Sequence, residues 1–359
     1  MHEPRFKGNE KKYLNECIDS GFVSSVGAFV TALEKKAAEY TGAKYAVAAV
    51  NGTAAIHIGL HALGVRKDHE VITQAFTFVA TGNAISYTGA ESIFVDIDPE
   101  TLGMCPVSLE NFLEEHAEVK DGHCYNKTTG KRIAACVPMH TFGFPCQIDK
   151  IVSICEKWSL PVLEDSAESL GSYYQEKHTG TFGKIGAISF NGNKIATAGG
   201  GGILITNDEE TAKYLKHITT TAKIPHAWEY VHDEVAYNYR MPNINAALLL
   251  AQFEQMPQFL KEKRAVAEQY QIFFNNLPIH CYRESKNSRS NYWLNAIEFE
   301  SAIERDLFLK ESNEKGVMTR PPWKPLHLLE MFNKCQKTNL KITEDLAKRI
   351  VNIPSSSLP

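Results

Sequence analysis

The sequence has no long apolar run and no excess of charge of either sign. No apolar stretch reaches the roughly 18 residues that a membrane-spanning helix needs. Lysine and arginine together number 38 against 42 aspartate and glutamate residues, so the formal net charge is −4. This balance gives neither the basic surface that binds nucleic acid nor a polybasic membrane patch. We therefore expect no nucleic-acid partner and no membrane partner, and the polar N-terminus does not resemble a signal peptide.

Closely spaced cysteine pairs are also missing. The eight cysteines are scattered along the chain, and no two of them have the Cys-x-x-Cys spacing of a zinc ribbon or a thioredoxin-like motif. Several lie in apolar segments, where a free thiol behaves as a small hydrophobic side chain. A reducing compartment suits such a set of thiols, and we expect a cytoplasmic protein.

Motifs of three other protein classes are absent. The first predicted strand is not followed by GxGxxG, which a dinucleotide-binding protein would carry there. The chain has no GxSxG, the motif that presents the serine of α/β hydrolases. His57 and His61 have the spacing of zinc ligands on a helix, but Ile58 stands where the HExxH motif needs glutamate. We therefore expect no metal site.

What is present is the pattern of an α/β protein with a second, smaller unit. A chain of 359 residues, 43% hydrophobic and 22% charged, has an ordinary globular composition and is long enough for two domains. After a helical segment over residues 8–40, short apolar strands alternate with helices. This order predicts a large, mostly parallel sheet with helices on both faces. We place this domain at residues 1–245 and a smaller α+β domain at 246–359.

Two segments carry further expectations. Residues 108–130 have the pattern of a helix followed by a polar loop, and residues 244–275 that of one long helix. The chain ends in an Ile-Pro-Ser-Ser-Ser-Leu-Pro segment at 353–359.

Residues 161–208 contain acidic, basic and glycine-rich segments in close succession. One apolar strand ends at Asp165, a second ends at Ser189 and is followed by Lys194, and a glycine run occupies 199–202. Ligands of such sheets bind at the carboxyl ends of the strands. A pyridoxal 5'-phosphate site needs a lysine for the Schiff base and an acid for the pyridine nitrogen, so this order of residues suits one.

Each of these features also has an ordinary explanation when it is considered alone. A lysine is usually a solvated surface charge. An aspartate at the end of a strand often caps a helix, and a glycine run usually forms a turn. Only the order of the three features favours a cofactor site.

Gly52 and Thr53 lie between a predicted strand and a predicted helix. The first turn of a helix has free backbone N–H groups and the positive end of the helix dipole, where a phosphate can bind. The alternative is that Asn51 or Thr53 only caps the helix.

Several separated motifs resemble the DegT/DnrJ/StrS family of pyridoxal-phosphate-dependent nucleotide-sugar aminotransferases. They are the acidic segment at 164–172, the Gly-Thr-Phe-Gly segment at 180–183, and residues 189–194 before the glycine run. The similarity extends over nearly the whole chain. It implies the type I fold of pyridoxal-phosphate enzymes, pyridoxal 5'-phosphate as cofactor, and a homodimer.

The resemblance implies catalytic roles for Lys194 and Asp165. Lys194 would carry the cofactor and shuttle the proton, and Asp165 would hold the pyridine nitrogen in its protonated form. Phe78 would stack on the cofactor ring. Glu168 stands where relatives often have glutamine or histidine, facing the phenolic oxygen of the cofactor. We expect this carboxyl to be protonated or turned toward a neighbour.

The resemblance also implies the binding of phosphate and substrate. Gly52, Thr53 and Ser189 would bind the cofactor phosphate. Asn238, in an Asn-Tyr-Arg-Met segment, would reach the cofactor phosphate of the partner subunit. His327, in a Pro-Leu-His segment, would contact the nucleotide sugar. Relatives usually continue for another helix after a stretch like 354–356, so we expect a truncated or partly ordered chain.

Short segments near the N-terminus resemble the legionaminic-acid and bacillosamine subgroup of this family. That resemblance implies amino transfer from glutamate to C4 of a UDP-linked 4-keto-6-deoxy N-acetylhexosamine in bacterial surface-sugar biosynthesis. One alternative is a 3- or 4-keto dTDP- or GDP-sugar aminotransferase, and another is a non-catalytic nucleotide-sugar-binding relative. Some relatives are dehydratases with histidine at the lysine position, so the presence of Lys194 favours amino transfer.

Overall fold

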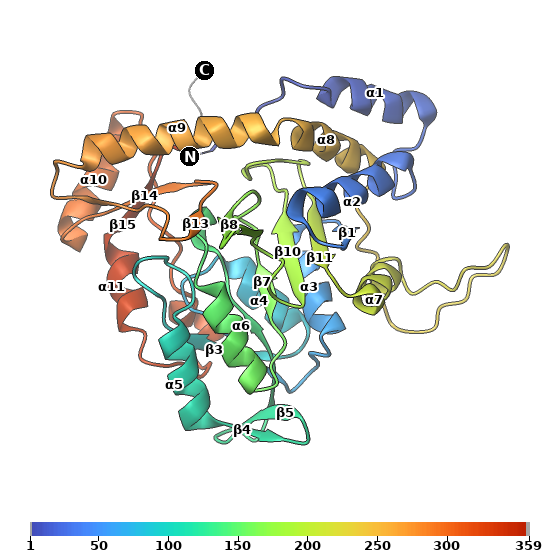
Figure 1. Cartoon of the computed structure of the whole chain (residues 1–359), viewed down its shortest axis with the longest axis horizontal. Coiled ribbons are helices and arrows are strands. Elements are labelled where there is room, and N and C mark those ends of the chain that lie inside the picture. Colours follow the sequence, from blue (N-terminus) through green and yellow to red (C-terminus); the bar gives the residue numbers. More distant parts are fainter. Residues whose placement is uncertain (1, 357–359) are drawn as a thin grey trace.

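The computed structural model describes residues 2–356 and has a central sheet enclosed by helices (Figure 1). One part of the sheet has the strand order β1-β11-β10-β7, and another has the order β3-β2-β6-β5-β4. Single parallel bridges, Cys136 to Val162 and Met139 to Asp165, join the two parts. The strands that build this sheet are β1 (Tyr45–Ala49), β2 (Glu70–Gln74), β3 (Glu91–Val95), β4 (Ala117–Lys120), β5 (His123–Asn126), β6 (Arg132–Val137), β7 (Leu163–Asp165), β10 (Ile185–Ser189) and β11 (Gly202–Thr206).

The core of the sheet is mostly parallel, as the sequence predicts. β10 pairs in parallel with β7, and β2 pairs in parallel with both β3 and β6. β11 is antiparallel to β1 and to β10, and at the other edge β5 is antiparallel to β6 and to β4. The segment between β10 and β11 contains no helix that could cross over the sheet, so the chain turns back beside β10. This returning segment carries Lys194 and the glycine run.

Helices cover both faces of the sheet. Leu204 of β11 packs in one apolar core with α3, α4 and α7, while its neighbours Ile203 and Ile205 pack in another core with α2 and α8. A third core joins α5 and α6 to Ile72 of β2, to Ile93 and Val95 of β3, and to Ile133 and Cys136 of β6. Side chains that alternate between two cores show that both faces are covered. These helices are α2 (Ala28–Thr41), α3 (Gly52–Ala62), α4 (Val79–Tyr87), α5 (Pro106–His116), α6 (Ile148–Lys157), α7 (Glu209–Thr219) and α8 (Asn243–Glu254).

α3 lies very close to the sheet. A Cβ at Gly59 would come within 2.4 Å of Leu163 Cδ1 on β7, so only glycine allows this approach. Eight of the eleven residues of α3 are buried. This packing fixes the N-terminus of α3 beside the ends of β7 and β10.

Two expectations from the sequence are corrected. The polar loop expected before residue 130 contains a hairpin, in which β4 pairs with β5. Its turn is Asp121-Gly122 with φ of 49° and 74°, the positive angles of a two-residue hairpin turn. The single helix expected over 244–275 is two helices, α8 and α9 (Met256–Phe274). The break at Gln255 precedes Pro257, which has no N–H to continue the helical hydrogen bonds.

The C-terminal part forms a small sheet with its own apolar core. β14 pairs with β12 and with β15, and the core includes Phe274 of α9. Figure 1 shows α9 running across the top of the molecule beside these strands. The elements of this part are β12 (His280–Cys281), β14 (Asn295–Glu298), α10 (Ala302–Glu314), α11 (Lys341–Arg349) and β15 (Ile350–Ile353).

The domain boundary predicted after residue 245 lies inside α8. This helix packs against α2 and against α1 (Glu10–Ser20). The division into two domains therefore stays a prediction. The expectation about the end of the chain concerns in part residues 357–359, which lie outside the described residues.

The remaining short elements lie at the surface or near the strand ends. β8 pairs with β9 and with β13. Three turns of 3-10 helix complete the structure. These elements are β8 (Tyr173–Tyr174), β9 (Lys177–His178), β13 (Ser288–Arg289) and the turns Thr141–Gly143, Leu326–Leu328 and Glu330–Phe332. From residue 2 to residue 356, no helix is both long enough and apolar enough to cross a membrane.

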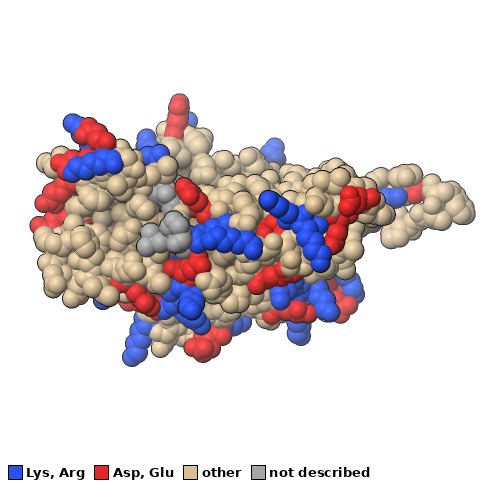
Figure 2. Space-filling view, turned by 90° about the horizontal axis from the view of Figure 1, so that it is seen from above, with Lys and Arg blue, Asp and Glu red and all other residues tan. Residues whose placement is uncertain are grey.

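Residues 220–240 form an arm that projects from the body between α7 and α8 (Figure 1). Figure 2 shows the arm as a narrow projection, most of whose visible face is uncharged. Trp228, Tyr230 and Val235 on this arm are 78%, 80% and 88% exposed. Large apolar side chains gathered at an exposed site mark a surface that another molecule covers.

Candidate active site

A cavity of about 370 Å³ opens at the carboxyl ends of the central strands. Its walls come from the ends of β7 and β10, the first turns of α3 and α4, and two loops of the C-terminal half. All the residues that we predict for the site, apart from Asn238 and His327, line this cavity: Gly52, Thr53, Phe78, Asp165, Glu168, Ser189 and Lys194.

Asp165 ends β7 and is almost completely buried. Thr81 Oγ1 donates a hydrogen bond of 2.7 Å to Oδ2, and the N–H of Ala167 donates one of 3.1 Å to Oδ1. Burial raises the pKa of Asp165, while these hydrogen bonds and the charge of Lys194 oppose the rise. A cation beside this carboxylate would keep it ionised, and a protonated pyridine ring is such a cation.

Glu164, the residue before Asp165, fixes the loop behind the site. Its carboxylate accepts three backbone N–H groups from the Gly-Thr-Phe-Gly segment at 180–183, at 2.6–2.7 Å. His140 Nε2 lies 3.0 Å from Glu164 Oε2. Burial alone would raise the pKa of Glu164, but the contacts with His140 and the backbone lower it. The motif at 180–183 thus holds the end of β7 in place.

Lys194 lies in the segment that follows β10, and its side chain is 12% exposed. Its Nζ is 3.2 Å from Glu168 Oε1 and 4.0 Å from the centre of the Trp293 ring. The indole N–H of Trp293 donates a hydrogen bond of 2.7 Å to the carbonyl of Asn193. The amine therefore lies between a carboxylate and an aromatic face, inside the cavity.

Glu168 contacts two partners in the cavity wall. One oxygen pairs with Lys194, and the other accepts the N–H of Phe142 at 2.9 Å. Burial raises the pKa of Glu168 to about 7, although the charge of Lys194 and the hydrogen bonds lower it. This carboxyl therefore changes its charge near neutral pH. Its role toward the phenolic oxygen of a cofactor stays a prediction.

Gly52 begins α3 beside Ser189. Asn51 caps this helix, because its Oδ1 accepts the N–H of Ala54 at 2.7 Å. The N–H groups of Gly52 and Thr53 belong to the first turn, which has no intrahelical partners. A Cβ at Gly52 would lie 2.7 Å from the Cβ and 2.9 Å from the Oγ of Ser189. The close approach of α3 to Ser189 therefore requires glycine at position 52. The cap by Asn51 does not exclude a phosphate at this turn, and the binding of a phosphate here stays a prediction.

The aromatic side chains of the cavity include two that our sequence reasoning did not select. Phe78 is half-exposed at the start of α4, and its ring centre lies 6.1 Å from that of Trp323. Trp323 and Trp293 both line the cavity. The prolines around Trp323 stiffen its loop and could have indicated a fixed aromatic wall. No local signal marks Trp293. Thr81, which supports Asp165, lies three residues after Phe78 on the same helix.

Asn238 and His327 do not line the cavity of this chain. His327 is buried, and its Nε2 is 3.1 Å from Glu344 Oε1. Asn238 lies on the arm, where its Oδ1 accepts hydrogen bonds from the Arg240 guanidinium at 2.9 and 3.1 Å. The roles expected for these two residues stay predictions.

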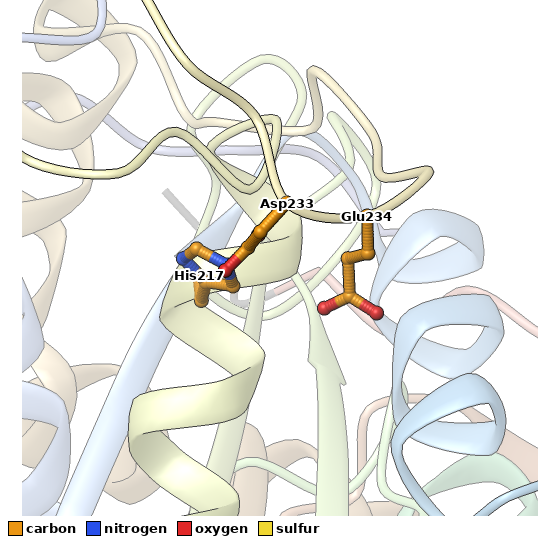
Figure 3. A group of neighbouring side chains, drawn as sticks. All are labelled: His217, Asp233 and Glu234. Carbon is orange, nitrogen blue, oxygen red and sulfur yellow. The ribbon is translucent and has the colours of Figure 1, made fainter.

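Among residues 2–356, one group of three side chains has a geometry that could hold a metal ion. It consists of His217, Asp233 and Glu234, whose ligand atoms lie within 4.8 Å of one another. Figure 3 shows His217 of α7 facing Asp233 of the arm, with Glu234 beside them. His217 Nε2 already pairs with Asp233 Oδ1 at 2.7 Å, and the Tyr214 hydroxyl donates to Glu234 at 3.2 Å. These contacts attach the arm to α7 without an ion.

Comparison with known proteins shows the family to which the chain belongs. Residues 4–358 match the DegT/DnrJ/EryC1/StrS aminotransferase family. The chain is 39% identical over 355 residues to "GDP-perosamine synthase" of Escherichia coli O157:H7, an alignment that covers 99% of this chain and 92% of the relative. It is 35% identical over 362 residues to "Putative pyridoxal phosphate-dependent aminotransferase EpsN" of Bacillus subtilis (strain 168), with coverage of 99% and 90%. A solved DegT DnrJ EryC1 StrS aminotransferase from Brucella abortus superposes with a TM-score of 0.86 at 27% identity, covering 97% of this chain and 90% of that chain.

Proposed function

Because this chain belongs to the DegT/DnrJ/EryC1/StrS aminotransferase family and its cofactor is pyridoxal 5'-phosphate, we propose that it transfers an amino group from glutamate to a keto carbon of a nucleotide-linked sugar. One observation carries this proposal. The amine of Lys194, the carboxylate of Asp165 and the N-terminus of α3 all meet at one cavity. The non-catalytic alternative has no use for a lysine and an aspartate arranged in this way.

The residues of the cavity fit the cofactor. Bound pyridoxal phosphate supplies an electron sink for amino transfer. Lys194 would hold the cofactor and move a proton at its Nζ. Asp165, supported by Thr81, would keep the pyridine nitrogen protonated. The first turn of α3 and the hydroxyl of Ser189 would bind the phosphate, because Gly52 lets the helix and β10 come together there.

The name of one relative supports a GDP-linked sugar. That relative is a GDP-perosamine synthase that aligns with almost the whole chain. We therefore favour the GDP-linked keto sugar, which was an alternative at the level of sequence, over the UDP-linked 4-keto-6-deoxy N-acetylhexosamine. Glutamate as donor and C4 as the position of transfer are parts of this proposal.

We further propose that the active unit is a homodimer. The arm at 220–240 exposes Trp228 and Tyr230, which a second copy would cover. Asn238 lies at the base of the same arm, where it could enter the partner's cavity. A twofold pair would then contain two equivalent sites. The eight cysteines are all free, which supports a cytoplasmic location.

The decisive experiment incubates the purified protein with glutamate and a panel of GDP-, UDP- and dTDP-linked keto sugars. Mass spectrometry then detects the amino sugar. We expect a product with a GDP-linked member, none with Lys194→Ala, and normal conversion with Lys184→Ala, which removes an exposed lysine. Conversion of a UDP-linked sugar alone would overturn the choice of nucleotide, and conversion of none would overturn the proposed function.

A further inference from the structure

Lys263 of α9 is a buried lysine with two carbonyl oxygens and an imidazole nitrogen around its Nζ. It donates to the carbonyl of Trp293 at 2.7 Å and to the carbonyl of Ser355 at 2.7 Å. Nδ1 of His2 lies 3.3 Å away. The side chain is 2% exposed. All three donors of an ammonium group are therefore directed at specific partners.

No carboxylate within the described part of the chain lies at ion-pair distance from Lys263. Burial lowers the pKa of this lysine to about 7. An ammonium without a counter-ion is costly to bury. This cost suggests that the contacts of Lys263 serve a purpose other than packing.

The first contact of Lys263 leads directly to the candidate active site. The carbonyl of Trp293 accepts a hydrogen bond from Lys263, and its indole N–H donates one to the carbonyl of Asn193. The face of the same indole ring contacts the amine of Lys194. The N–H of Trp293 also donates to Asn291 Oδ1 at 2.8 Å. Both the backbone and the side chain of Trp293 are thus fixed.

The second contact fixes the segment on the other side of the lysine. The carbonyl of Ser355 accepts a hydrogen bond from Lys263. Its Oγ accepts two more from Asn295, one from the backbone N–H at 2.8 Å and one from the side-chain amide at 3.2 Å. Asn295 begins β14, two residues after Trp293. The ammonium therefore joins the segment that contains Trp293 to the segment that contains Ser355.

We propose that Lys263 is a positioning residue of the active site, which holds the Trp293 indole under the amine of Lys194. The role of Lys194 in this statement rests on the proposed function. The contacts themselves do not, and they can be tested in the protein without cofactor.

The test measures how fast trace acetic anhydride acetylates Lys194 in the cofactor-free full-length protein at constant pH, by peptide mass spectrometry. The face of the Trp293 ring stabilises the charged form of the Lys194 amine, which does not react with the anhydride, and it also shields the amine. Lys263→Met should therefore accelerate the acetylation of Lys194 by roughly threefold to tenfold. Acetylation of the exposed Lys184 in the same sample should not change. The matched control is Lys261→Met, which removes an exposed lysine of the same helix.

A double-mutant cycle separates positioning from general support of the fold. In a Trp293→Ala background, Lys263→Met should add no further change in the acetylation of Lys194. Lys263→Gln keeps two N–H donors, should give an intermediate rate, and decides the question if Lys263→Met does not fold. A variant that loses thermal stability but acetylates Lys194 at the wild-type rate would overturn the proposal. A failure of the proposed function would appear separately, as absence of amino transfer with the acetylation result unchanged.

Discussion

The Nζ of Lys194 lies 3.2 Å from Oε1 of Glu168 in the wall of the cavity. Both side chains are shielded from solvent, since Glu168 is almost fully buried and Lys194 is 12% exposed. A change in the charge of the Lys194 amine therefore acts directly on the protonation of the Glu168 carboxyl. This pair also has a consequence for stability.

The pH dependence of stability should contain a contribution from Glu168. Burial raises its pKa from 4.5 to about 7 in the folded chain. Between these two pH values the folded chain keeps a proton that the unfolded chain has released, so stability falls as the pH rises. The full contribution is on the order of 3 kcal/mol. In the cofactor-free protein, Glu168→Gln should therefore flatten the decline of unfolding free energy between pH 4.5 and pH 7.

Chemical denaturation at several pH values measures this change in slope. Glu156→Gln, which removes an exposed glutamate, is the control and should leave the slope unchanged. A Glu168→Gln variant with the wild-type slope would show that this carboxyl is ionised in the folded chain at pH 5.

Asp165 should affect turnover far more than stability. Asp165→Asn keeps the shape of the side chain but cannot hold a pyridine nitrogen in its protonated form. We expect kcat to fall by on the order of 10²–10⁴-fold with little change in melting temperature. Thr81→Val removes only the 2.7 Å hydrogen bond to Asp165 and should cause a smaller loss. Equal losses in the two variants, or near-normal turnover in Asp165→Asn, would contradict the assigned role.

Gly52 should be required for cofactor binding because of its contact with Ser189. A Cβ at this position would lie 2.7 Å from the Cβ of Ser189, so Gly52→Ala must push α3 away from β10. Overpacking of this kind costs about 1–3 kcal/mol, which corresponds to roughly a ten- to hundredfold loss of cofactor affinity. Titration with pyridoxal phosphate, followed by absorbance, measures the loss.

The control for this prediction is Gly192→Ala, since a Cβ at Gly192 would meet no atom within 4 Å. Ser189→Gly in the Gly52→Ala background should relieve the clash and restore part of the affinity. If affinity is unchanged in Gly52→Ala, the phosphate does not bind at this helix.

Most of the predicted site residues meet at one cavity because they lie near strand ends or helix starts. Asp165 and Ser189 end neighbouring parallel strands, and the carboxyl ends of parallel strands meet at one edge of the sheet. Gly52 begins a helix that returns to the same edge. Strand ends and helix starts are local patterns, so the sequence indicates them without coordinates. The family resemblance carried by the motifs at 164–172, 180–183 and 189–194 is confirmed.

The supporting residues could not be predicted in this way. Trp293 reaches Asn193 across 100 positions of the sequence, and Lys263 reaches Trp293 across 30. Such contacts arise from packing between distant segments, for which no periodicity or spacing exists. The β4–β5 hairpin is a different case, because the Asp121-Gly122 pair is a local turn signal that the polarity of the surrounding segment obscured.

The arm at 220–240 should control the oligomeric state. Trp228 and Val235 are 78% and 88% exposed, and the His217–Asp233 pair attaches the arm to α7. Serine at both exposed positions would remove apolar area from an interface without disturbing the body of the chain, because neither side chain packs into a core. We expect sedimentation to show a dimer for the wild type and mostly monomer for Trp228→Ser/Val235→Ser at equal concentration. Ile303→Ser, which removes an 81% exposed side chain on α10, should remain a dimer.

If Asn238 completes the partner's site, the monomeric variant should also lose cofactor affinity. A higher concentration of this variant should then restore the dimer and the cofactor affinity together. A monomer that binds the cofactor as tightly as the wild type would show that each chain completes its own site, and the assignment of Asn238 to the partner's phosphate would be wrong.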